Sequence, residues 1–290
     1  MKNRWNAALF EQFTDDLLAQ RVYSSQLLGQ EPQLVLHGGG NTSVKITEEN
    51  AFGEKEDILY VKGSGWDLAT IQAAGFAPVK LEILLRLAQF QHLSDAEMVR
   101  LQRTAMTQPD APNPSVEAIL HAIIPFRFVD HSHADAVVTI SNTANGLERI
   151  RSIYQERVLI IPYVMPGFEL AKLVYEQTKN IDWDTVDALI LMNHGVFTFH
   201  QQAAQSYNNM IQIVQQAEDY LEDLNIKELA AHQTGQQAVH TLVGLRKKVS
   251  QIRGQALIAR MDCQGSTFSF SKLPNLSSIA NRGPLTPDHI

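Results

Sequence analysis

The chain has 290 residues, a mass of 32.4 kDa, a formal net charge of −7 and a pI near 5.8. A chain of this length buries enough apolar surface to fold without disulfides or a structural metal. Its acidic balance argues against non-specific nucleic-acid binding, and its single cysteine, Cys263, excludes an intramolecular disulfide. The sequence contains no run of about 18 apolar residues, the length that a membrane-spanning helix needs. The N-terminus lacks the pattern of a signal peptide. We therefore expect a cytoplasmic protein of one or two domains.

Periodicity predicts helices that alternate with short strands along the chain. Apolar residues at helical spacing predict helices over 4–28, 79–90, 94 onward, 115–122, 166–178, 201–224 and 241–252. Alternating or uniformly apolar runs predict strands over 34–36, 42–46, 58–61, 128–135, 136–140, 158–161, 188–192, 196–199, 256–261 and 266–270. Because many of these strands look like hairpin partners, we expect an α/β protein whose helices cover a mainly antiparallel or mixed sheet.

Three histidines form the first candidate site. His131 and His133 are two residues apart in a strand-like stretch, so their side chains project from one face. His194 lies in an expected tight turn after the apolar run 188–192. Three neutral imidazoles that meet form a zinc-type catalytic site with its fourth position open. The alternative is that His131 and His133 are two strand histidines on a polar face. The spacing alone favours neither the metal site nor this alternative.

Several residues near these motifs have a structural alternative. Asp130 and Asp135 flank the histidine pair and would orient an imidazole, but we expect both to be solvated loop charges. Glu117 lies in the first turn of the helix that Ser115 begins, where an acidic residue complements the helix dipole. Beside a metal, in a partly dry pocket, the same carboxylate would transfer protons. His121, one turn further on, is expected to be structural.

Two glycine-rich turns form a candidate anion site. HGGGNTS occupies residues 37–43 and VKGSG occupies residues 61–65, and each follows a predicted strand. Backbone N–H groups approach an anion closely at such turns, the hydroxyls add donors, and Lys45 and Lys62 add positive charge. The turns match neither the P-loop nor the dinucleotide-binding fingerprint. Together they indicate one phosphate cradle.

The ordered motifs HGGGNTS, VKGSG, PSVEAILH, DHSHAD and MNHG resemble the class II aldolase and adducin family over roughly residues 5–225. The strings look most like the aldolase half of bifunctional rhamnulose-1-phosphate aldolase/dehydrogenase proteins. The resemblance implies a three-layer α/β/α fold with a mainly antiparallel sheet. It also implies a catalytic domain over 1–228, with an extension over 229–290 that we expect to pack on the same domain, and a homo-oligomer, usually a tetramer.

The resemblance also implies roles for individual residues. His131, His133 and His194 would hold one divalent metal ion per subunit, for which zinc is the first expectation. Glu117 would be the catalytic acid/base, and Tyr163, acting from a neighbouring subunit, would exchange a proton with the aldehyde side. The residues that match positions binding the substrate phosphate are Gly40, Asn41, Ser43, Ser64, Gly65 and Ser115.

The implied reaction is reversible cleavage of a ketose 1-phosphate. For rhamnulose 1-phosphate the products would be dihydroxyacetone phosphate and lactaldehyde. Val116 stands where many members carry a serine, which fits the bifunctional subgroup, and no fingerprint indicates nicotinamide-dependent activity. The alternatives are a sugar-phosphate epimerase or dehydratase and a non-catalytic, adducin-like binding module. Glu117 favours an aldolase or dehydratase, and the complete histidine set argues against the module.

Overall fold

The structure, a computed structural model, describes residues 1–225, 239–260, 265–283 and 285. Met1–Leu224 forms the bulk of one compact unit and Asn225–Gly283 forms the other. The domain boundary expected at residue 228 lies outside the described residues, and the docking of the extension on the catalytic domain stays a prediction.

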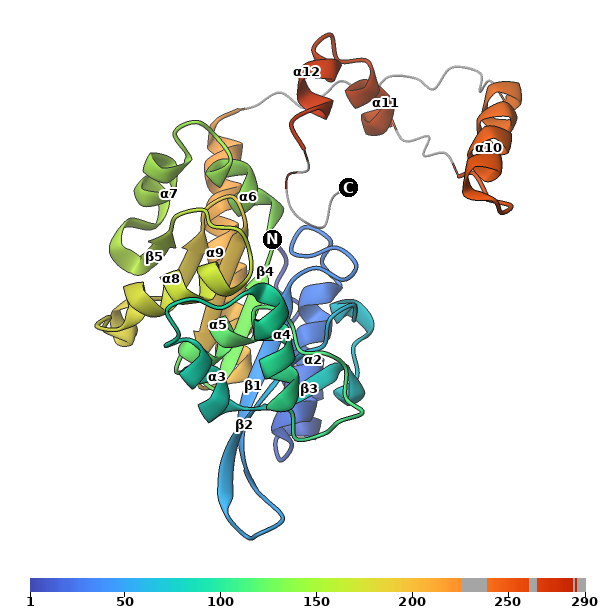
Figure 1. Ribbon diagram of the computed structural model, residues 1–290. Helices are drawn as coiled ribbons and strands as arrows, with labels where there is room; N and C mark the ends of the chain where they lie inside the picture. Colours follow the sequence, from blue (N-terminus) through green and yellow to red (C-terminus); the bar gives the residue numbers. More distant parts are fainter. Residues whose placement is uncertain (226–238, 261–264, 284, 286–290) are drawn as a thin grey trace. The chain divides into compact units, whose positions relative to one another are not determined.

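A seven-stranded mixed sheet forms the centre of the first unit, with strand order β3-β2-β1-β4-β7-β6-β5 (Figure 1). The strands are β1 Asn41–Glu49, β2 Lys55–Lys62, β3 Phe76–Lys80, β4 Phe128–Ser132, β5 Val158–Ile161, β6 Ala188–Leu191 and β7 Gly195–His200. Neighbouring strands pair antiparallel except β5 and β6, which pair parallel. The expectation of a mainly antiparallel sheet is confirmed.

Helices cover both faces of this sheet. The α-helices are α1 Ala7–Phe10, α2 Leu17–Gly29, α3 Leu81–Leu87, α4 Asp95–Thr104, α5 Ala118–Ile123, α6 Asp135–Ser141, α7 Gly146–Tyr154, α8 Phe168–Thr178 and α9 Ala203–Asp223. The 3₁₀ helices are η1 Glu11–Phe13, η2 Leu68–Thr70, η3 Ala73–Gly75, η4 Gln155–Arg157 and η5 Trp183–Thr185. None of the described helices is long and apolar enough to cross a bilayer.

Strand alternation divides the core between the two faces. In β6, Leu189 and Leu191 pack in the cluster that contains residues of α3, α4, α5 and α8, whereas Ala188 and Ile190 pack with α2, α6, α7 and α9. Figure 1 shows the sheet between these two groups of helices. The expected three-layer α/β/α fold is therefore confirmed.

Several predicted elements of the first unit were wrong in type or extent. The helix expected over 4–28 is interrupted, and Asp16 caps α2 by accepting from two backbone N–H groups. The run 34–36 forms no strand, because the N–H groups of Leu34 and Val35 bond locally to the Glu31 carbonyl. The helix expected from residue 79 begins at Leu81, since Pro78 lies in β3 at the sheet edge, where proline is tolerated.

The strand expected over 136–140 is the helix α6, and the preceding strand ends at Ser132. This segment is buried at every position except Thr139. A short run that is buried nearly all round has no periodicity to separate a helix from a strand. Its β-branched residues therefore favoured the wrong element.

The second unit contains α10 Val239–Arg253, α11 Gly265–Ser271 and α12 Leu276–Ala280. The helix predicted over 241–252 is confirmed. The strand pair predicted over 256–261 and 266–270 was wrong, because 266–270 lies in α11 and 256–260 has no regular structure. Residue 261 lies outside the described residues. Two short strands without a sheet to join have little to stabilise them.

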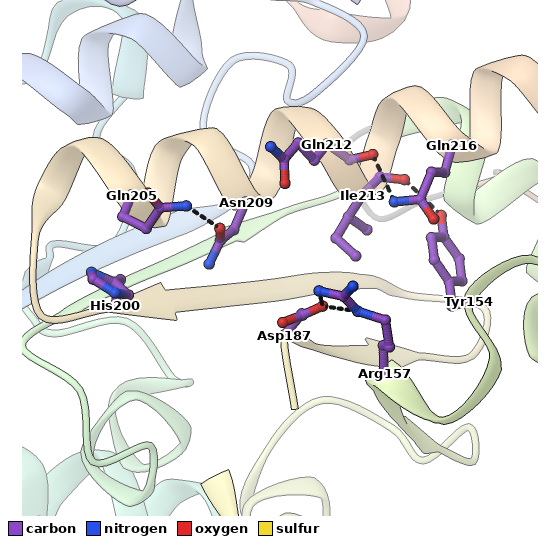
Figure 2. A pocket seen from close by; sticks show the side chains of 9 residues that line it. All are labelled: Tyr154, Arg157, Asp187, His200, Gln205, Asn209, Gln212, Ile213 and Gln216. Carbon is purple, nitrogen blue, oxygen red and sulfur yellow. Dashed lines mark hydrogen bonds and ion pairs between the residues drawn. The ribbon is translucent and has the colours of Figure 1, made fainter. Parts of the chain in front are cut away.

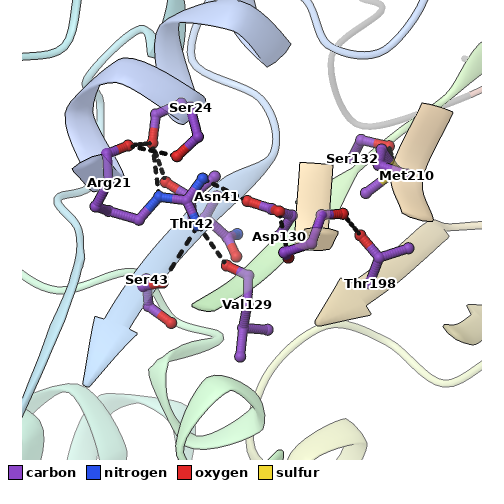
Figure 3. A network of polar contacts seen from close by, with 12 residues as sticks. Arg21, Ser24, Asn41, Thr42, Ser43, Val129, Asp130, Ser132, Thr198 and Met210 are labelled. Atoms are coloured by element: carbon purple, nitrogen blue, oxygen red, sulfur yellow. Dashed lines mark hydrogen bonds and ion pairs between the residues drawn. The ribbon is translucent and has the colours of Figure 1, made fainter. Parts of the chain in front are cut away.

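A buried ion pair fixes β4 against the helices on one face (Figure 3). Arg21 of α2 lies 2.5 Å from the carboxylate of Asp130, which also accepts from the Ser206 hydroxyl of α9 at 2.5 Å. Both charged side chains are fully buried, so the expectation of a solvated Asp130 was wrong. The Arg21 guanidinium also donates to the Ser43 carbonyl. The network holds the residue directly before His131.

Candidate metal and active site

The three histidines meet at one end of β4. His131 lies within β4, His133 directly follows the strand, and His194 lies in the turn between β6 and β7. One ring nitrogen of each lies within 4.8 Å of the others, and all three side chains are buried. The fold brings them together because β7 pairs with β4, placing the β6–β7 turn beside the end of β4. Of the two alternatives that the spacing left equally weighted, the structure shows the meeting of the three histidines.

The His131 ring is oriented by its backbone neighbour. Its Nδ1 lies 3.1 Å from the Val196 carbonyl, and the ring stacks on Phe197 at 4.1 Å between centroids. A carbonyl only accepts, so Nδ1 carries the hydrogen and Nε2 presents its lone pair. Burial, with help from the His133 and His194 imidazoles, lowers the pKa of His131 well below its ordinary value. The ring is therefore neutral at pH 7, the form that binds a metal.

Glu117 faces this histidine group from the start of α5. One carboxylate oxygen, Oε2, accepts from the Asn41 amide at 2.6 Å and lies 3.4 Å from His131 Nε2. The other, Oε1, lies 3.4 Å from His194 Nε2 and has no hydrogen-bond partner among the described residues. The helix begins at Ala118 rather than at Ser115, whose hydroxyl accepts from the Glu117 N–H.

The donor set fits a divalent cation. His131 Nε2 is buried and has no hydrogen-bond partner in the described part of the chain, although it faces a carboxylate oxygen. Two acceptors that face each other without a proton or cation between them are unfavourable. A metal held by the three imidazoles would satisfy the nitrogen, and the second ring nitrogen already has the carbonyl partner typical of metal-bound histidines.

A cavity of about 250 Å³ opens beside the histidines. Its lining residues are Gly38, Gly39, Gly40, Asn41, Lys62, Ser64, Gly65, Ser115, Val116, Glu117, His133, Pro166 and His194. The cavity thus joins both glycine-rich turns to Glu117 and two of the histidines. Gly40 has φ +59°, and a Cβ there would lie 2.5 Å from Val35 Cγ1 and 2.8 Å from the His131 carbonyl. Glycine is required at this close approach.

Besides His131, Ser43 and Tyr163 are predicted site residues that do not line the cavity. Ser43 is fully buried, and its hydroxyl lies 2.8 Å from Nδ1 of His121. Tyr163 is 53% exposed in the segment after β5. Its expected role was in the site of a neighbouring subunit, so that role stays a prediction.

The two lysines of the predicted anion site have different surroundings. Lys62 lines the cavity and donates to the Gly38 carbonyl at 2.8 Å. Lys45 does not reach it, because its ammonium donates to three carbonyls at the end of α5, those of His121, Ile124 and Phe126. Burial lowers the pKa of Lys45 to about 7. Lys45 therefore anchors α5, and the expectation that it binds an anion was wrong.

His121, which was expected to be structural, contacts two of the predicted site residues. Its ring is fully buried and contacts both Ser43 and Asn41. The available signal was its position four residues after Glu117, which places both side chains on one face of a helix.

A separate cavity of about 380 Å³ lies along α9, away from these motifs (Figure 2). Its lining combines four carboxamides of α9 with His200 and the Arg157–Asp187 ion pair. None of the predicted site residues lines it. The sequence motifs converge on the smaller cavity instead.

Comparison with known families agrees with this geometry. Residues 19–221 match the family described as Class II Aldolase and Adducin N-terminal domain. The chain belongs to the class II aldolase and adducin family. The matched range includes every residue that the motifs singled out, from Gly40 to His194. The likeness to the bifunctional rhamnulose-1-phosphate subgroup stays a prediction.

One relative is similar to almost the whole of this class II aldolase family member. The uncharacterized oxidoreductase YuxG of Bacillus subtilis is 32% identical over 280 residues, which are 93% of this chain and 40% of that protein. The chain therefore spans well under half of that relative's length.

Two solved structures are similar to about three quarters of the chain. The N-terminal class II aldolase domain of a conserved protein from Thermoplasma acidophilum is 40% identical, with a TM-score of 0.69 over 76% of this chain and 99% of that domain. A sugar-phosphate aldolase from Thermotoga maritima, at 16% identity and TM-score 0.51, covers 74% of this chain and 96% of its own and shares the fold.

Proposed function

We propose that this protein is a metal-dependent class II aldolase that reversibly cleaves a ketose 1-phosphate into dihydroxyacetone phosphate and an aldehyde. Rhamnulose 1-phosphate, which would give lactaldehyde, is the first substrate to test. The observation that carries the proposal is the convergence of three buried imidazoles and the Glu117 carboxylate on one cavity with two glycine-rich turns. Membership of the class II aldolase family supports it.

His131, His133 and His194 would hold the divalent ion, with zinc as the first expectation because it suits three imidazoles and an open fourth position. When bound, such an ion supplies Lewis-acid polarisation of the substrate's carbonyl oxygen. Burial keeps the His131 imidazole neutral, which is the form that binds a metal.

Glu117 would transfer the proton at the carbon where the bond breaks. In cleavage it would protonate the enediolate to give dihydroxyacetone phosphate, and in synthesis it would remove the same proton. Its Oε1 suits this task because Glu117 lines the cavity and Oε1 accepts no hydrogen bond from the described residues.

The substrate phosphate would bind at the glycine-rich turns. Ser64 and Ser115 offer hydroxyls, Lys62 offers an ammonium group, and the backbone around Gly40 and Gly65 approaches the cavity without side chains. The aldehyde side would receive its proton from Tyr163 of a neighbouring subunit in a homo-oligomer, expected to be a tetramer.

The test is cleavage of a panel of ketose 1-phosphates, including rhamnulose 1-phosphate, by the metal-loaded protein. Release of dihydroxyacetone phosphate would be followed by enzymatic reduction to glycerol 3-phosphate, with Glu117→Gln as the matched control. Triose release that depends on metal and on Glu117 supports the proposal. Epimer formation or loss of water without triose release would instead indicate an epimerase or dehydratase and overturn it.

A further inference from the structure

A chain of hydrogen bonds leads from the interior of the protein to the Glu117 carboxylate. The Ser43 hydroxyl lies 2.8 Å from His121 Nδ1, His121 Nε2 contacts Asn41 Oδ1, and the Asn41 amide nitrogen lies 2.6 Å from Glu117 Oε2. All four side chains are buried. Ser43 and Asn41 are alternate residues of β1, so both face α5, which carries His121 one turn after Glu117.

The chemistry of the two ends sets the direction of every bond in this chain. An ionised carboxylate only accepts, so Asn41 turns its NH₂ group toward Glu117 and its carbonyl oxygen toward His121. That carbonyl also only accepts, so His121 Nε2 carries the hydrogen. His121 Nδ1 then presents its lone pair and accepts from the Ser43 hydroxyl. The Asn41 carbonyl thereby selects the tautomer of His121, and the Ser43 hydroxyl supports it by donating to Nδ1.

The surroundings of His121 keep its ring in place and uncharged. The ring packs edge-on against Phe197 at 5.3 Å between centroids. Its own backbone carbonyl accepts from the Lys45 ammonium at 2.8 Å, which holds the end of α5. Burial lowers the pKa of His121 well below its ordinary value. A neutral imidazole has one donor and one acceptor nitrogen, and here each has a partner.

We propose that His121 is a positioning residue, which acts through Asn41 to hold Glu117 by Oε2 and thereby present Oε1 as the oxygen that exchanges a proton with the substrate. Of the two carboxylate oxygens, only Oε1 is without a hydrogen-bond partner in the described part of the molecule. The proposal rests on the proposed function, because that function gives Glu117 its proton-transfer role. It assigns to Ser43 a place behind the site rather than contact with phosphate.

The first test measures the tautomer directly and needs no activity. Nitrogen-15 NMR of the uniformly labelled 290-residue chain would assign the His121 signals by their loss in His121→Gln. We expect the Nε2–H tautomer, and we expect Ser43→Ala to weaken that preference. An Nδ1–H tautomer or a charged imidazolium in the wild-type protein would overturn the proposal, whether or not the protein cleaves sugar phosphates.

The second test is a kinetic cycle with the ketose 1-phosphate that the wild-type protein cleaves. His121→Leu removes both ring nitrogens, and we expect it to lower kcat by about 10- to 100-fold, as small misplacements of a catalytic group do, with KM nearly unchanged. His121→Gln keeps an amide donor toward Asn41 and should recover part of the rate. Metal content and melting temperature would be measured for each variant.

The decisive comparison adds His121→Leu to Glu117→Gln. If His121 acts through Glu117, the double variant is no slower than Glu117→Gln alone, because the group being positioned has already lost its function. Multiplied losses would show a general structural effect and overturn the proposal. Absence of cleavage by the wild-type protein would instead contradict the proposed function, and the NMR result would still decide the direction of the hydrogen bonds.

Discussion

Nε2 of His131 and Oε2 of Glu117 face each other at 3.4 Å, and both atoms are acceptors. Nδ1 of the same ring donates its hydrogen to the Val196 carbonyl, so Nε2 carries no hydrogen and can only accept. The oxygen is held by the Asn41 amide. Such a pair is stable when a cation lies near both atoms, so the metal-free protein should gain stability when a divalent ion is added.

If the three histidines hold one metal ion, removal of any one imidazole should lower the metal content of the protein. His194→Ala should lose the ion and most activity, because two imidazoles hold zinc poorly. Elemental analysis after dialysis would measure the metal-to-protein ratio. His92→Ala, which alters an exposed histidine, is the control. Equal metal content in His194→Ala and wild type would remove His194 from the ligand set.

Glu117→Gln should separate metal binding from proton transfer. The amide keeps the size of the side chain and a contact to Asn41 but cannot take a proton. We expect normal metal content and a rate lower by about 10²–10⁴-fold, the usual contribution of a positioned acid or base. Steady-state cleavage and elemental analysis on the same sample would test this, and near-normal turnover would exclude Glu117 from the mechanism.

Gly195 predicts a steric test of the metal site. A Cβ at this position would lie 2.3 Å from the Ser132 carbonyl, 3.0 Å from His131 Cε1 and 3.2 Å from a carbon of the His133 ring. Gly195→Ala should therefore weaken metal binding and lower the melting temperature. Gly38→Ala adds a methyl where no atom lies within 4 Å and should leave both quantities close to wild type. Similar behaviour of the two variants would contradict the packing described here.

The Arg21–Asp130 pair predicts an asymmetric effect on stability. Arg21→Met leaves the Asp130 carboxylate buried without its cation, and we expect a loss of about 3–5 kcal/mol in the free energy of unfolding. The double variant Arg21→Met with Asp130→Leu removes both charges and should cost less than Arg21→Met alone. Urea unfolding of the three proteins would measure this, and additive losses would show that the two charges do not compensate each other.

Buried imidazoles predict loss of stability in acid for the metal-free protein. The pKa values of His121 and His131 are lowered well below 6.5 in the folded state, so only the unfolded chain binds these protons as the pH falls below 6.5. Each group then lowers the free energy of unfolding by about 1.4 kcal/mol per pH unit. Chemical denaturation between pH 7 and 5, in the presence of a chelator, would measure the slope. His121→Gln should show a smaller slope, and an unchanged one would contradict the assignment.

The sequence indicated which residues form the candidate site better than it predicted the helices and strands. His131 and His133 follow strand alternation, and His194 follows an apolar run that ends in a turn, so both signals are local. The type of α6 and the start of α3 depend on which faces are buried, and tertiary packing decides that.

Long-range partners were equally hidden from the sequence. The expectation that Asp130 is solvated was wrong, because its ion-pair partner, Arg21, lies on a helix far earlier in the chain. Lys45 looked like any charged residue of an alternating strand, yet the three carbonyls that hold it belong to α5 and the segment after it. Sequence motifs indicate which residues are candidates for the site, whereas the contacts of Asp130 and Lys45 depend on the completed fold.

Three alternate residues of strand β1 make contacts at successive points along α5, from the residue before its start to its end. Asn41, Ser43 and Lys45 are alternate residues, and they contact Glu117, His121 and the carbonyls at the helix end, respectively. A slip of one residue in the pairing of β1 would replace all three by their neighbours on the opposite face of the sheet. The alignment of an ordinary antiparallel ladder therefore positions the Glu117 carboxylate. If Glu117 transfers protons as proposed, mutations far along that ladder would change its rate without touching the cavity.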